Sequence, residues 1–406
     1  MPIIYLGSIF PASLLETIER NSKGNIQYAS NAFQWHFLNG FHENNVFNLN
    51  IVNAPMVGSY PIFYKKLFLP EININIKNNI IGKSISYLNI PLIKNLFIEY
   101  GLSKELNYLV NSYKDEQITI VIYGMHTPFM KAALNAKKKN IKLCLIVPDL
   151  PEFMNNSKGI IWKLRYLIQP NRNKFIPFID SFVLFTDAMA DFLLIKNKPW
   201  IRIEGMVNPD EHKIKNFRGK SEKKVILYTG TLASRYGIID LLDAFESIND
   251  PEYELWICGE GDTDHIINVK KEKDKRIKYF GLVPREKVLE LQVKATVLVN
   301  PRSNKGEYTK YSFPSKTMEY LLSGTPVIMR KLPGIPPEYD KYIYYTSNTS
   351  IEAFRDKIIE VCEQDKHLLI SFGKNARSFV LQEKNLTIQG KKIVDFIINR
   401  NFDKNV

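Results

Sequence analysis

The chain has 406 residues, of which 45% are hydrophobic and 24% charged, so it is neither a disordered nor a collagen-like chain. Its length is about twice that of a usual domain, which predicts two domains of roughly 200 residues. The net charge of +13 favours an anionic partner, such as nucleic acid, lipid headgroups or a phosphorylated ligand. No zinc-finger spacing, RNP aromatic pattern or helix-turn-helix signature accompanies this charge, so we expect no nucleic-acid partner.

The N-terminal run "IIYLGSIF" (3–10) predicts the first strand of a domain. A glycine and a serine interrupt it and no basic region precedes it, so we expect neither a signal peptide nor a membrane span. No other stretch has about 18 uninterrupted apolar residues, which predicts a soluble or peripheral protein. The cysteines lie far apart without a CxxC pair, which predicts buried thiols in a reducing compartment: Cys144, Cys258 and Cys362.

Strands and a helix alternate in the first half of the chain. "ITIVIYG" (118–124) and "IKLCLIV" (141–147) predict buried strands, and "FMKAALNAKKK" (129–139) predicts the helix between them. This β-α-β order indicates a parallel sheet in a first domain over residues 1–204.

A basic segment follows at 157–175, with five Lys or Arg residues and no acid. On a helical wheel its apolar residues form one arc, while cations, Trp and Tyr share the other. Such a face suits an anionic membrane surface, where each basic residue contributes about 1 kcal/mol. A helix that packs its apolar arc in the core and leaves its basic face solvated fits the pattern equally. The candidate membrane residues are Lys158, Trp162, Lys163, Arg165 and Tyr166.

The segment 205–222 is polar, contains Pro and Gly, and lacks apolar periodicity, which predicts an interdomain linker. Over 223–385, strands and helices alternate with a short period, which predicts a second parallel sheet covered on both faces. A final helix over 386–406 is a candidate to pack back on the first domain. The expected strands of the second sheet are 225–229, 254–258, 277–281, 296–300 and 326–329.

Three loops of small residues follow consecutive strands of this second sheet: "YTGTLASRYG" (228–237), "ICGEGD" (257–262) and "FGLVP" (280–284). Glycine lets the backbone approach a ligand closely, and the helix after the first loop offers amide donors to an anion such as phosphate. Each loop alone is equally well an ordinary turn. Together they predict a flat ligand over the sheet edge, in the cleft between the two domains.

A fourth segment, "FPSKTMEYLLSGTPVI" (313–328), completes an ordered set of motifs. Together these segments give residues 223–345 a pattern that resembles the family 4 glycosyltransferases of the GT-B fold. Residues 120–153 resemble that family's late N-domain strands more loosely. The resemblance implies an α/β protein with two Rossmann-like parallel-sheet domains facing across a cleft. The second domain would bind a nucleotide diphosphate sugar and the first would bind the acceptor.

The resemblance also implies an activity, namely sugar transfer with retention of anomeric configuration to a glycan acceptor. We expect a lipid-linked acceptor, in surface polysaccharide (capsule or exopolysaccharide) or glycoconjugate synthesis, and an enzyme that is cytoplasmic and peripheral on the inner face of the plasma membrane. Family members usually need no metal, and the sequence has no metal-ligand cluster, so we expect neither metal nor cofactor. Two alternatives are a nonhydrolysing nucleotide-sugar epimerase and an inactive GT-B subunit that binds glycan or stabilises a partner.

The resemblance assigns donor-site residues by position. A glutamate at the position of Glu319 accepts hydrogen bonds from the nucleotide ribose, and the helix N-terminus before it faces the diphosphate. Lys316, one turn earlier, is expected to share the leaving-group charge with Arg235, whereas a surface Lys–Glu pair is the alternative. Tyr311 stands where many relatives have a second glutamate for the donor sugar. The expected donor-binding residues are Gly230, Thr231, Gly259, Gly261, Val283, Tyr311, Ser312, Phe313, Pro314, Ser315 and Glu319.

Two residues of the first half are candidates for the acceptor side. His126 follows the strand at 118–124 and Asp149 follows the strand at 141–147, so both are expected at carboxyl strand ends. Either side chain could orient or deprotonate the acceptor hydroxyl. A histidine after a strand is more often a structural hydrogen-bonding residue.

Overall fold

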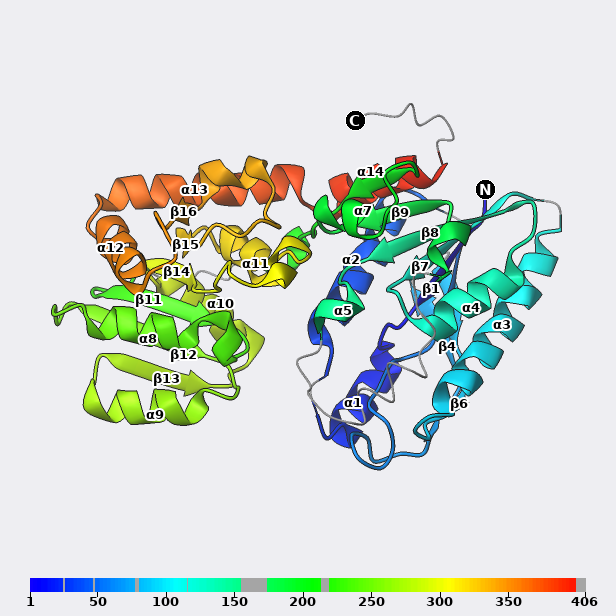
Figure 1. The fold of residues 1–406 in the computed structure, drawn as a ribbon, viewed down its shortest axis with the longest axis horizontal. Helices are drawn as coiled ribbons and strands as arrows, with labels where there is room; N and C mark the ends of the chain where they lie inside the picture. The colour runs from blue at the N-terminus through cyan, green and yellow to red at the C-terminus, as the bar shows by residue number, and fades with distance from the viewer. Residues whose placement is uncertain are drawn as a thin grey trace. The chain divides into compact units, whose positions relative to one another are not determined.

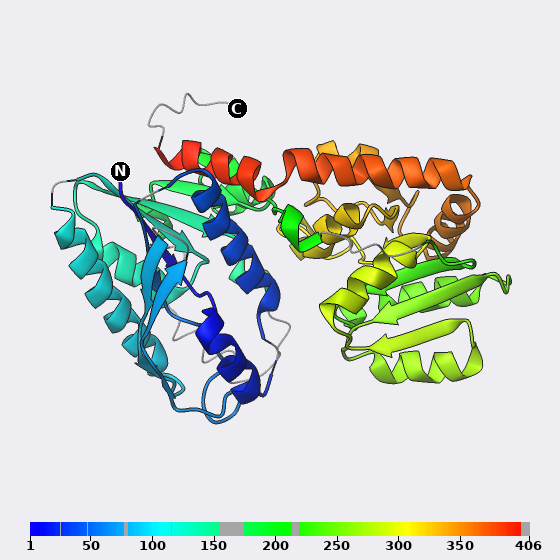
Figure 2. The ribbon, with the colours of Figure 1, turned by 180° about the vertical axis from the view of Figure 1, so that it is seen from behind.

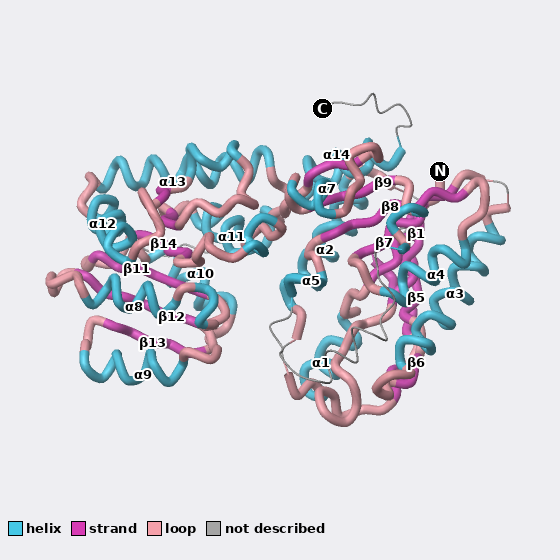
Figure 3. The backbone as a smooth tube through the Cα atoms, viewed as in Figure 1, coloured by secondary structure: helices cyan, strands magenta, loops and turns pink. Residues whose placement is uncertain are grey.

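The computed structural model describes residues 1–24, 26–46, 48–76, 80–114, 116–154, 174–212 and 219–398. The chain forms two compact units (Figures 1 and 2). Unit 1 consists of residues 1–204 together with the segment from Leu386 onward, and unit 2 consists of residues 205–385. Helices and strands alternate along the chain in both units (Figure 3), so each unit is an α/β structure.

Unit 1 is built on an 8-stranded sheet with the order β10-β9-β8-β7-β1-β2-β5-β4. All neighbouring strands are parallel except β4 and β5. The chain order reverses between β1 and β7, which is where open α/β sheets usually bind ligands. The strands are β1 Ile3–Gly7, β2 Leu49–Asn53, β4 Ile72–Ile76, β5 Ile80–Ser84, β7 Ile118–Tyr123, β8 Ile141–Val147, β9 Ser181–Leu184 and β10 Trp200–Arg202, with a separate pair β3 Phe68–Leu69 and β6 Tyr87–Leu88.

Helices cover both faces of this sheet. α3 packs beside α4 on one face, and α2 packs beside α14 on the other, as the two opposite views show (Figures 1 and 2). The central strands β1 and β7 are buried along their whole length, as expected for parallel strands with helices on both sides. The helices are α1 Ala12–Asn21, α2 Tyr28–Glu43, α3 Lys94–Ser112, α4 Thr127–Ala136, α5 Pro151–Met154, α7 Ala188–Phe192 and α14 Leu386–Ile398.

Two glycines bring α14 against α2. A Cβ atom on Gly390 would lie 2.7 Å from the backbone of Gly40, and a Cβ atom on Gly40 would lie 2.9 Å from the carbonyl oxygen of Leu386. Asn44 Nδ2 also donates to the carbonyl oxygen of Thr387 at 2.9 Å. The last helix of the described chain is therefore part of unit 1, with the two backbones in direct contact.

Gly390→Ala is expected to lower the free energy of unfolding of the protein by about 1 to 3 kcal/mol, because the added methyl group meets helix backbone, which cannot rotate away. Urea denaturation followed by circular dichroism measures this loss. Gly24→Ala is the matched control, since its Cβ would contact only the Phe63 ring, at 3.7 Å. Equal stability of the two variants would show that α14 is not held by this contact.

Unit 2 is built on a 6-stranded sheet with the order β13-β12-β11-β14-β15-β16, in which all neighbours are parallel. The chain order reverses between β11 and β14. The strands are β11 Lys224–Thr229, β12 Tyr253–Cys258, β13 Ile277–Gly281, β14 Val297–Asn300, β15 Val327–Met329 and β16 Tyr344–Tyr345, and the helices are α8 Ile238–Glu246, α9 Asp264–Lys273, α10 Arg285–Lys294, α11 Ser315–Ser323, α12 Ile351–Cys362 and α13 Lys366–Glu383.

The core of unit 2 lies on both faces of its sheet. Successive residues of β11 alternate between the faces, so Ile226 and Tyr228 join one apolar cluster while Val225 and Leu227 join the other. α8 and α12 cover the first cluster, and α11 and α13 cover the second. The predicted two parallel α/β domains are thus present, with helices on both faces of each sheet.

The sequence expectations about membrane spans and cysteines can be compared with the described residues. Across those ranges, no helix is both long enough and apolar enough to cross a bilayer. The cysteines are free and buried, as predicted: Cys144, Cys258 and Cys362.

Candidate functional site

Three loops meet at the carboxyl edge of the unit 2 sheet. The Gly230 N–H donates to the carbonyl oxygen of Cys258 at 3.0 Å, and the Gly259 N–H donates to that of Gly281 at 2.9 Å. The loops after β11, β12 and β13 are thus joined through their backbones. The three small-residue loops that the sequence placed in register do form one continuous edge.

Gly259 is the tightest point of this edge. It has a φ of +134°, and a Cβ atom on it would lie 1.8 Å from the carbonyl oxygen of Gly230. A Cβ atom on Gly261 would lie 2.1 Å from the carbonyl oxygen of Leu232. These positions therefore need glycine so that the first two loops can pack together.

α11 is tied to the end of β11 by a buried tyrosine. The Tyr320 hydroxyl accepts a hydrogen bond from the Thr229 N–H at 2.8 Å and donates one to the Thr229 carbonyl oxygen at 3.0 Å. Met318, Leu321 and Leu322 of the same helix lie in the core, as their helical spacing predicts. The N-terminus of α11 is consequently fixed at the carboxyl edge of the sheet.

Glu319 lies on α11 where three side chains converge on its carboxylate. Gln292 Nε2 donates to Oε1 at 2.6 Å, and Lys316 Nζ lies 2.9 Å from Oε1 and 3.1 Å from Oε2. Arg285 Nη1 lies 3.8 Å from Oε2. Gln292 is buried, and its Nε2 is also 3.4 Å from Thr229 Oγ1, so it links Glu319 to the end of β11.

The charges around Glu319 keep it ionised. Burial raises the pKa of Glu319, but the charge of Lys316 and the hydrogen bonds from Lys316 and Gln292 outweigh burial, so the pKa lies below its ordinary value. Burial raises the pKa of Cys258, at the end of β12, to about 11 against the opposing charge of Lys316. Lys316 therefore acts electrostatically on the carboxyl edge of the sheet.

Both cations near Glu319 belong to the first turns of helices. Lys316 is the second residue of α11, and Arg285 is the first residue of α10. A cation at a helix N-terminus is unfavourable with the helix dipole unless an anion is present. Glu319 supplies one negative charge, which leaves a net positive charge among these three groups. The arrangement suits an anionic ligand.

A second cation cluster follows β14, at the point where the strand order reverses. The Arg302 guanidinium lies over the rings of Tyr236 and Tyr308, at 5.3 Å and 4.6 Å from their centroids, and its Nη2 donates to Ser312 Oγ at 3.1 Å. Arg235 lies on the exposed 3-10 turn Ser234–Tyr236 and donates to the Tyr236 hydroxyl at 3.0 Å. Two tyrosine rings and a serine hydroxyl thus hold Arg302 in place, whereas Arg235 is exposed to solvent and contacts the adjacent Tyr236.

The other predicted donor-site residues occupy different environments. Phe313 is buried, with its ring 5.3 Å from that of Tyr339, and Val283 packs against the same apolar cluster. Pro314 is the N-cap of α11 and Ser315 is its exposed first residue. Tyr311 and Thr231 lie in turns. Tyr311 ends the 3-10 helix before α11, and the Thr231 carbonyl oxygen accepts a hydrogen bond from the Tyr228 hydroxyl. Side chains of Phe313 and Val283 are therefore structural.

The acceptor-side candidates lie at the carboxyl ends of neighbouring strands in unit 1. His126 is the N-cap residue of α4, with its ring 5.3 Å from that of Phe129 in an edge-on arrangement. Asp149 is exposed after β8. Burial raises the pKa of Tyr123, at the end of β7, and the charge of Asp149 adds to this shift. Asp149 and Tyr123 are therefore close, and Ser30 Oγ donates to the Tyr123 hydroxyl at 3.3 Å.

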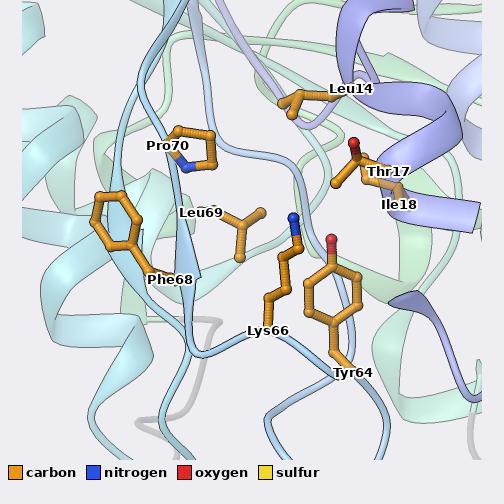
Figure 4. Close-up of a pocket in the computed structure, with 8 residues that line it drawn as sticks. All are labelled: Leu14, Thr17, Ile18, Tyr64, Lys66, Phe68, Leu69 and Pro70. Atoms are coloured by element: carbon orange, nitrogen blue, oxygen red, sulfur yellow. The ribbon is translucent and has the colours of Figure 1, made fainter. Parts of the chain in front are cut away.

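Unit 1 also has a cavity of about 370 Å³. Figure 4 shows Lys66 and Tyr64 pointing into it from the segment before β3, opposite side chains of α1. Figure 4 shows the ammonium group of Lys66 and the hydroxyls of Tyr64 and Thr17 among the apolar side chains that line it. The lining residues are Leu14, Thr17, Ile18, Tyr64, Lys66, Phe68, Leu69 and Pro70.

Two further sequence expectations concern a membrane surface and a metal ion. The candidate membrane residues lie outside the described residues: Lys158, Trp162, Lys163, Arg165 and Tyr166. Within the described ranges, no group of three or more His, Cys, Asp or Glu side chains is placed to hold a metal ion.

Sequence reasoning did not single out Gln292, Tyr320, Arg285 or Arg302. Gln292 and Tyr320 act through contacts with Thr229 across long stretches of chain, which no local pattern indicates. The positions of Arg285 and Arg302 in the sequence could have indicated their role. Arg285 comes directly after the loop 280–284, and Arg302 is the second residue after β14, so both lie at the edge where the other loops already indicated an anion.

Residues 210–379 match the family model described as glycosyl transferases group 1. Solved structures with the same fold include sucrose-phosphate synthase from Thermosynechococcus elongatus, with 13% identity, 98% of each chain covered and a TM-score of 0.66. The lipopolysaccharide outer core galactosyltransferase WaaB has 15% identity, 99% of this chain and 100% of that chain covered, and a TM-score of 0.62. HepE from Anabaena, in complex with UDP, has 12% identity, 98% and 99% covered, and a TM-score of 0.61. No curated protein sequence matches the chain.

Proposed function

We propose that the protein is a retaining glycosyltransferase that moves a sugar from a nucleotide-sugar donor to a lipid-linked glycan acceptor. The match of residues 210–379 to the glycosyl transferases of group 1 and the GT-B fold of the chain support the transfer from a nucleotide sugar. The family 4 resemblance supports retention. The fold shared with a lipopolysaccharide galactosyltransferase supports a role in surface glycan synthesis.

The single observation that carries the donor assignment is the Glu319 carboxylate, held between Gln292 and Lys316 at the carboxyl edge of the sheet. An ionised carboxylate fixed by two donors keeps lone pairs for the ribose hydroxyls of a nucleotide. Lys316 and Arg285, on helix N-termini, then face the diphosphate. In this proposal Arg302 provides further positive charge beyond the Arg235 contribution expected from the sequence.

The proposed transfer breaks the bond between the donor sugar and the diphosphate and forms a bond from the acceptor oxygen to the same sugar carbon. Negative charge grows on the departing diphosphate, and cations fixed in advance stabilise it more than they stabilise the bound donor. Asp149 and His126 are the candidates to take the acceptor proton. The proposal includes metal independence, which requires that excess EDTA leave turnover unchanged.

A panel of UDP-, GDP-, ADP- and dTDP-sugars tests the function by thermal stabilisation. The correct donor at 100 times its dissociation constant is expected to add about 2.7 kcal/mol of stability. Incubation with that donor and acceptor glycans, followed by NMR of the product, then gives the anomeric configuration. Absence of stabilisation by every nucleotide sugar would overturn the donor site, and an inverted product would overturn retention.

A further inference from the structure

Unit 1 exposes a group of large apolar side chains on two segments. Leu92 is 83% exposed, and Ile62 is 65% exposed. Single exposed apolar residues are ordinary, but a contiguous group of them marks an interaction site. We call this group the apolar surface, and its residues are Ile62, Phe63, Leu67, Phe68, Leu92, Ile93, Leu96, Phe97 and Tyr100.

Hydrogen bonds hold the two segments of the apolar surface side by side. Phe68 of β3 pairs with Leu88 of β6, and the Asn89 N–H donates to the Leu67 carbonyl oxygen at 2.7 Å. The Tyr60 N–H donates to the carbonyl oxygen of Asn89 at 3.1 Å. α3 packs against β6, so the exposed side chains of both segments lie in one region of the surface. β6 and the start of α3 lie together at one end of unit 1 (Figures 1 and 2).

This end of unit 1 is the carboxyl edge of its sheet. The first segment follows β2, and the second follows β5 and β6, which brings both to the edge where His126 and Asp149 follow β7 and β8. The cavity of Figure 4 adjoins the same segment, since Lys66 and Phe68 line it. The apolar surface thus shares an edge with the acceptor-side candidates.

Three lysines accompany the apolar surface without a carboxylate partner among the described residues. Lys23 Nζ donates to the carbonyl oxygen of Pro61 at 2.9 Å, and Lys65 Nζ donates to that of Arg20 at 3.0 Å. Lys66 is exposed beside them and reaches toward the cavity. Their positive charges are therefore available to an external anion.

One apolar side chain is presented at a conformational cost. Leu92 lies in a turn with a φ of +70°, in the left-handed region that residues other than glycine rarely adopt. The turn thus keeps a strained backbone while it directs a leucine into solvent. Strain of this kind is typical of sites that contact a ligand or a surface.

We propose that the apolar surface docks on an anionic lipid bilayer, with its apolar side chains among the acyl chains and Lys23, Lys65 and Lys66 at the headgroup phosphates. Apolar residues next to lysines match the two layers of such an interface. A symmetric dimer through this surface would place the lysines of two copies against each other. This inference rests on the proposed function, because a lipid-linked acceptor is the reason for the enzyme to bind a membrane. Vesicle binding is measured without donor or acceptor, so its failure can be told apart from failure of the proposed function.

The test is sedimentation of the full chain with vesicles of phosphatidylcholine alone and of phosphatidylcholine mixed with phosphatidylglycerol. The parent is expected to bind the mixed vesicles at low salt and to be released in part at high salt. Lys65→Gln with Lys66→Gln is expected to weaken that partition about 25-fold, at about fivefold for each lysine. Phe63→Ser with Leu92→Ser is expected to weaken it about tenfold or more.

Matched controls carry the same chemical changes elsewhere. Lys139→Gln with Lys142→Gln removes two exposed lysines at the amino edge of the sheet, and Leu194→Ser with Leu368→Ser removes two exposed leucines. Both controls are expected to bind as the parent does. Failure of the parent to bind, or equal binding by the surface variants, would overturn the proposal. A dimer in solution that Phe63→Ser with Leu92→Ser dissociates would assign the surface to a second copy and overturn it as well.

Discussion

Lys316→Met is expected to lower the rate of sugar transfer by about 100- to 1,000-fold while donor affinity changes much less. The variant keeps most of the side-chain stem and removes the cation 2.9 Å from Glu319 Oε1. If Lys316 stabilises charge that grows on the departing diphosphate, its loss acts on the transition state rather than on the bound donor. Single-turnover transfer rates, measured beside donor affinity by calorimetry, separate these two effects.

Glu319→Gln is the paired variant and is expected to fail differently. It keeps the shape of the side chain but removes the charged acceptor, so free nucleotide and nucleotide sugar should both bind about 10- to 100-fold more weakly. The change also releases Lys316 and Arg285 from their shared carboxylate. The double variant therefore completes a cycle that separates coupling between the pair from their separate effects on the donor.

An exposed Lys–Glu pair without a ligand would give another result. Such pairs contribute only about 0.2 to 1 kcal/mol to stability and nothing to chemistry. Glu319 differs from that case, because its side chain is 16% exposed and also contacts Gln292. Variants that bind and transfer like the parent would nonetheless remove both residues from the donor site.

Gly259→Ala is expected to lower the free energy of unfolding by about 3 kcal/mol or more and to abolish donor binding. The added Cβ atom would lie 1.8 Å from the carbonyl oxygen of Gly230, so the loops after β11 and β12 must separate. Backbone at that position has no rotamer by which to relieve the clash. Chemical denaturation and calorimetry with the donor measure the two losses.

Gly281→Ala is the control for this prediction. Gly281 also has a positive φ, of +64°, but a Cβ atom on it would meet nothing within 4 Å. Its substitution therefore costs only backbone strain, about 1 to 2 kcal/mol. If the two variants were equally stable, the close approach of the first two loops would not be what holds this edge together.

The sequence predicted the buried strands best. The bounds expected at 141–147 agree with β8, because a strand covered on both faces consists of nearly continuous apolar residues. The bounds expected at 277–281 also agree with β13, although β13 is an edge strand and is only partly buried. It did not predict β2 and β5, whose residues "LNIVN" and "IIGKS" mix polar and apolar types within five positions. Their assignment depends on pairing with β1 and with each other, which is not encoded locally.

The same distinction applies to the candidate site. Lys316 and Glu319 are three residues apart on one helix, so their proximity follows from the sequence alone. The contacts of Gln292 with Glu319 and of Tyr320 with Thr229 join residues 27 and 91 positions apart. Phe313 could not be told from a ligand-facing residue by its position in a motif, because only packing shows that its ring lies in the core.

The contact between Gly40 and Gly390 has a consequence for synthesis of the chain. Unit 2 is one contiguous segment, so all of its strands and helices have been synthesised by residue 385. Unit 1 begins first, but its α2 face is completed only by α14, which starts at Leu386. The N-terminal unit is therefore expected to finish folding last, and a nascent chain stalled before Leu386 should expose α2 to chaperones or proteases.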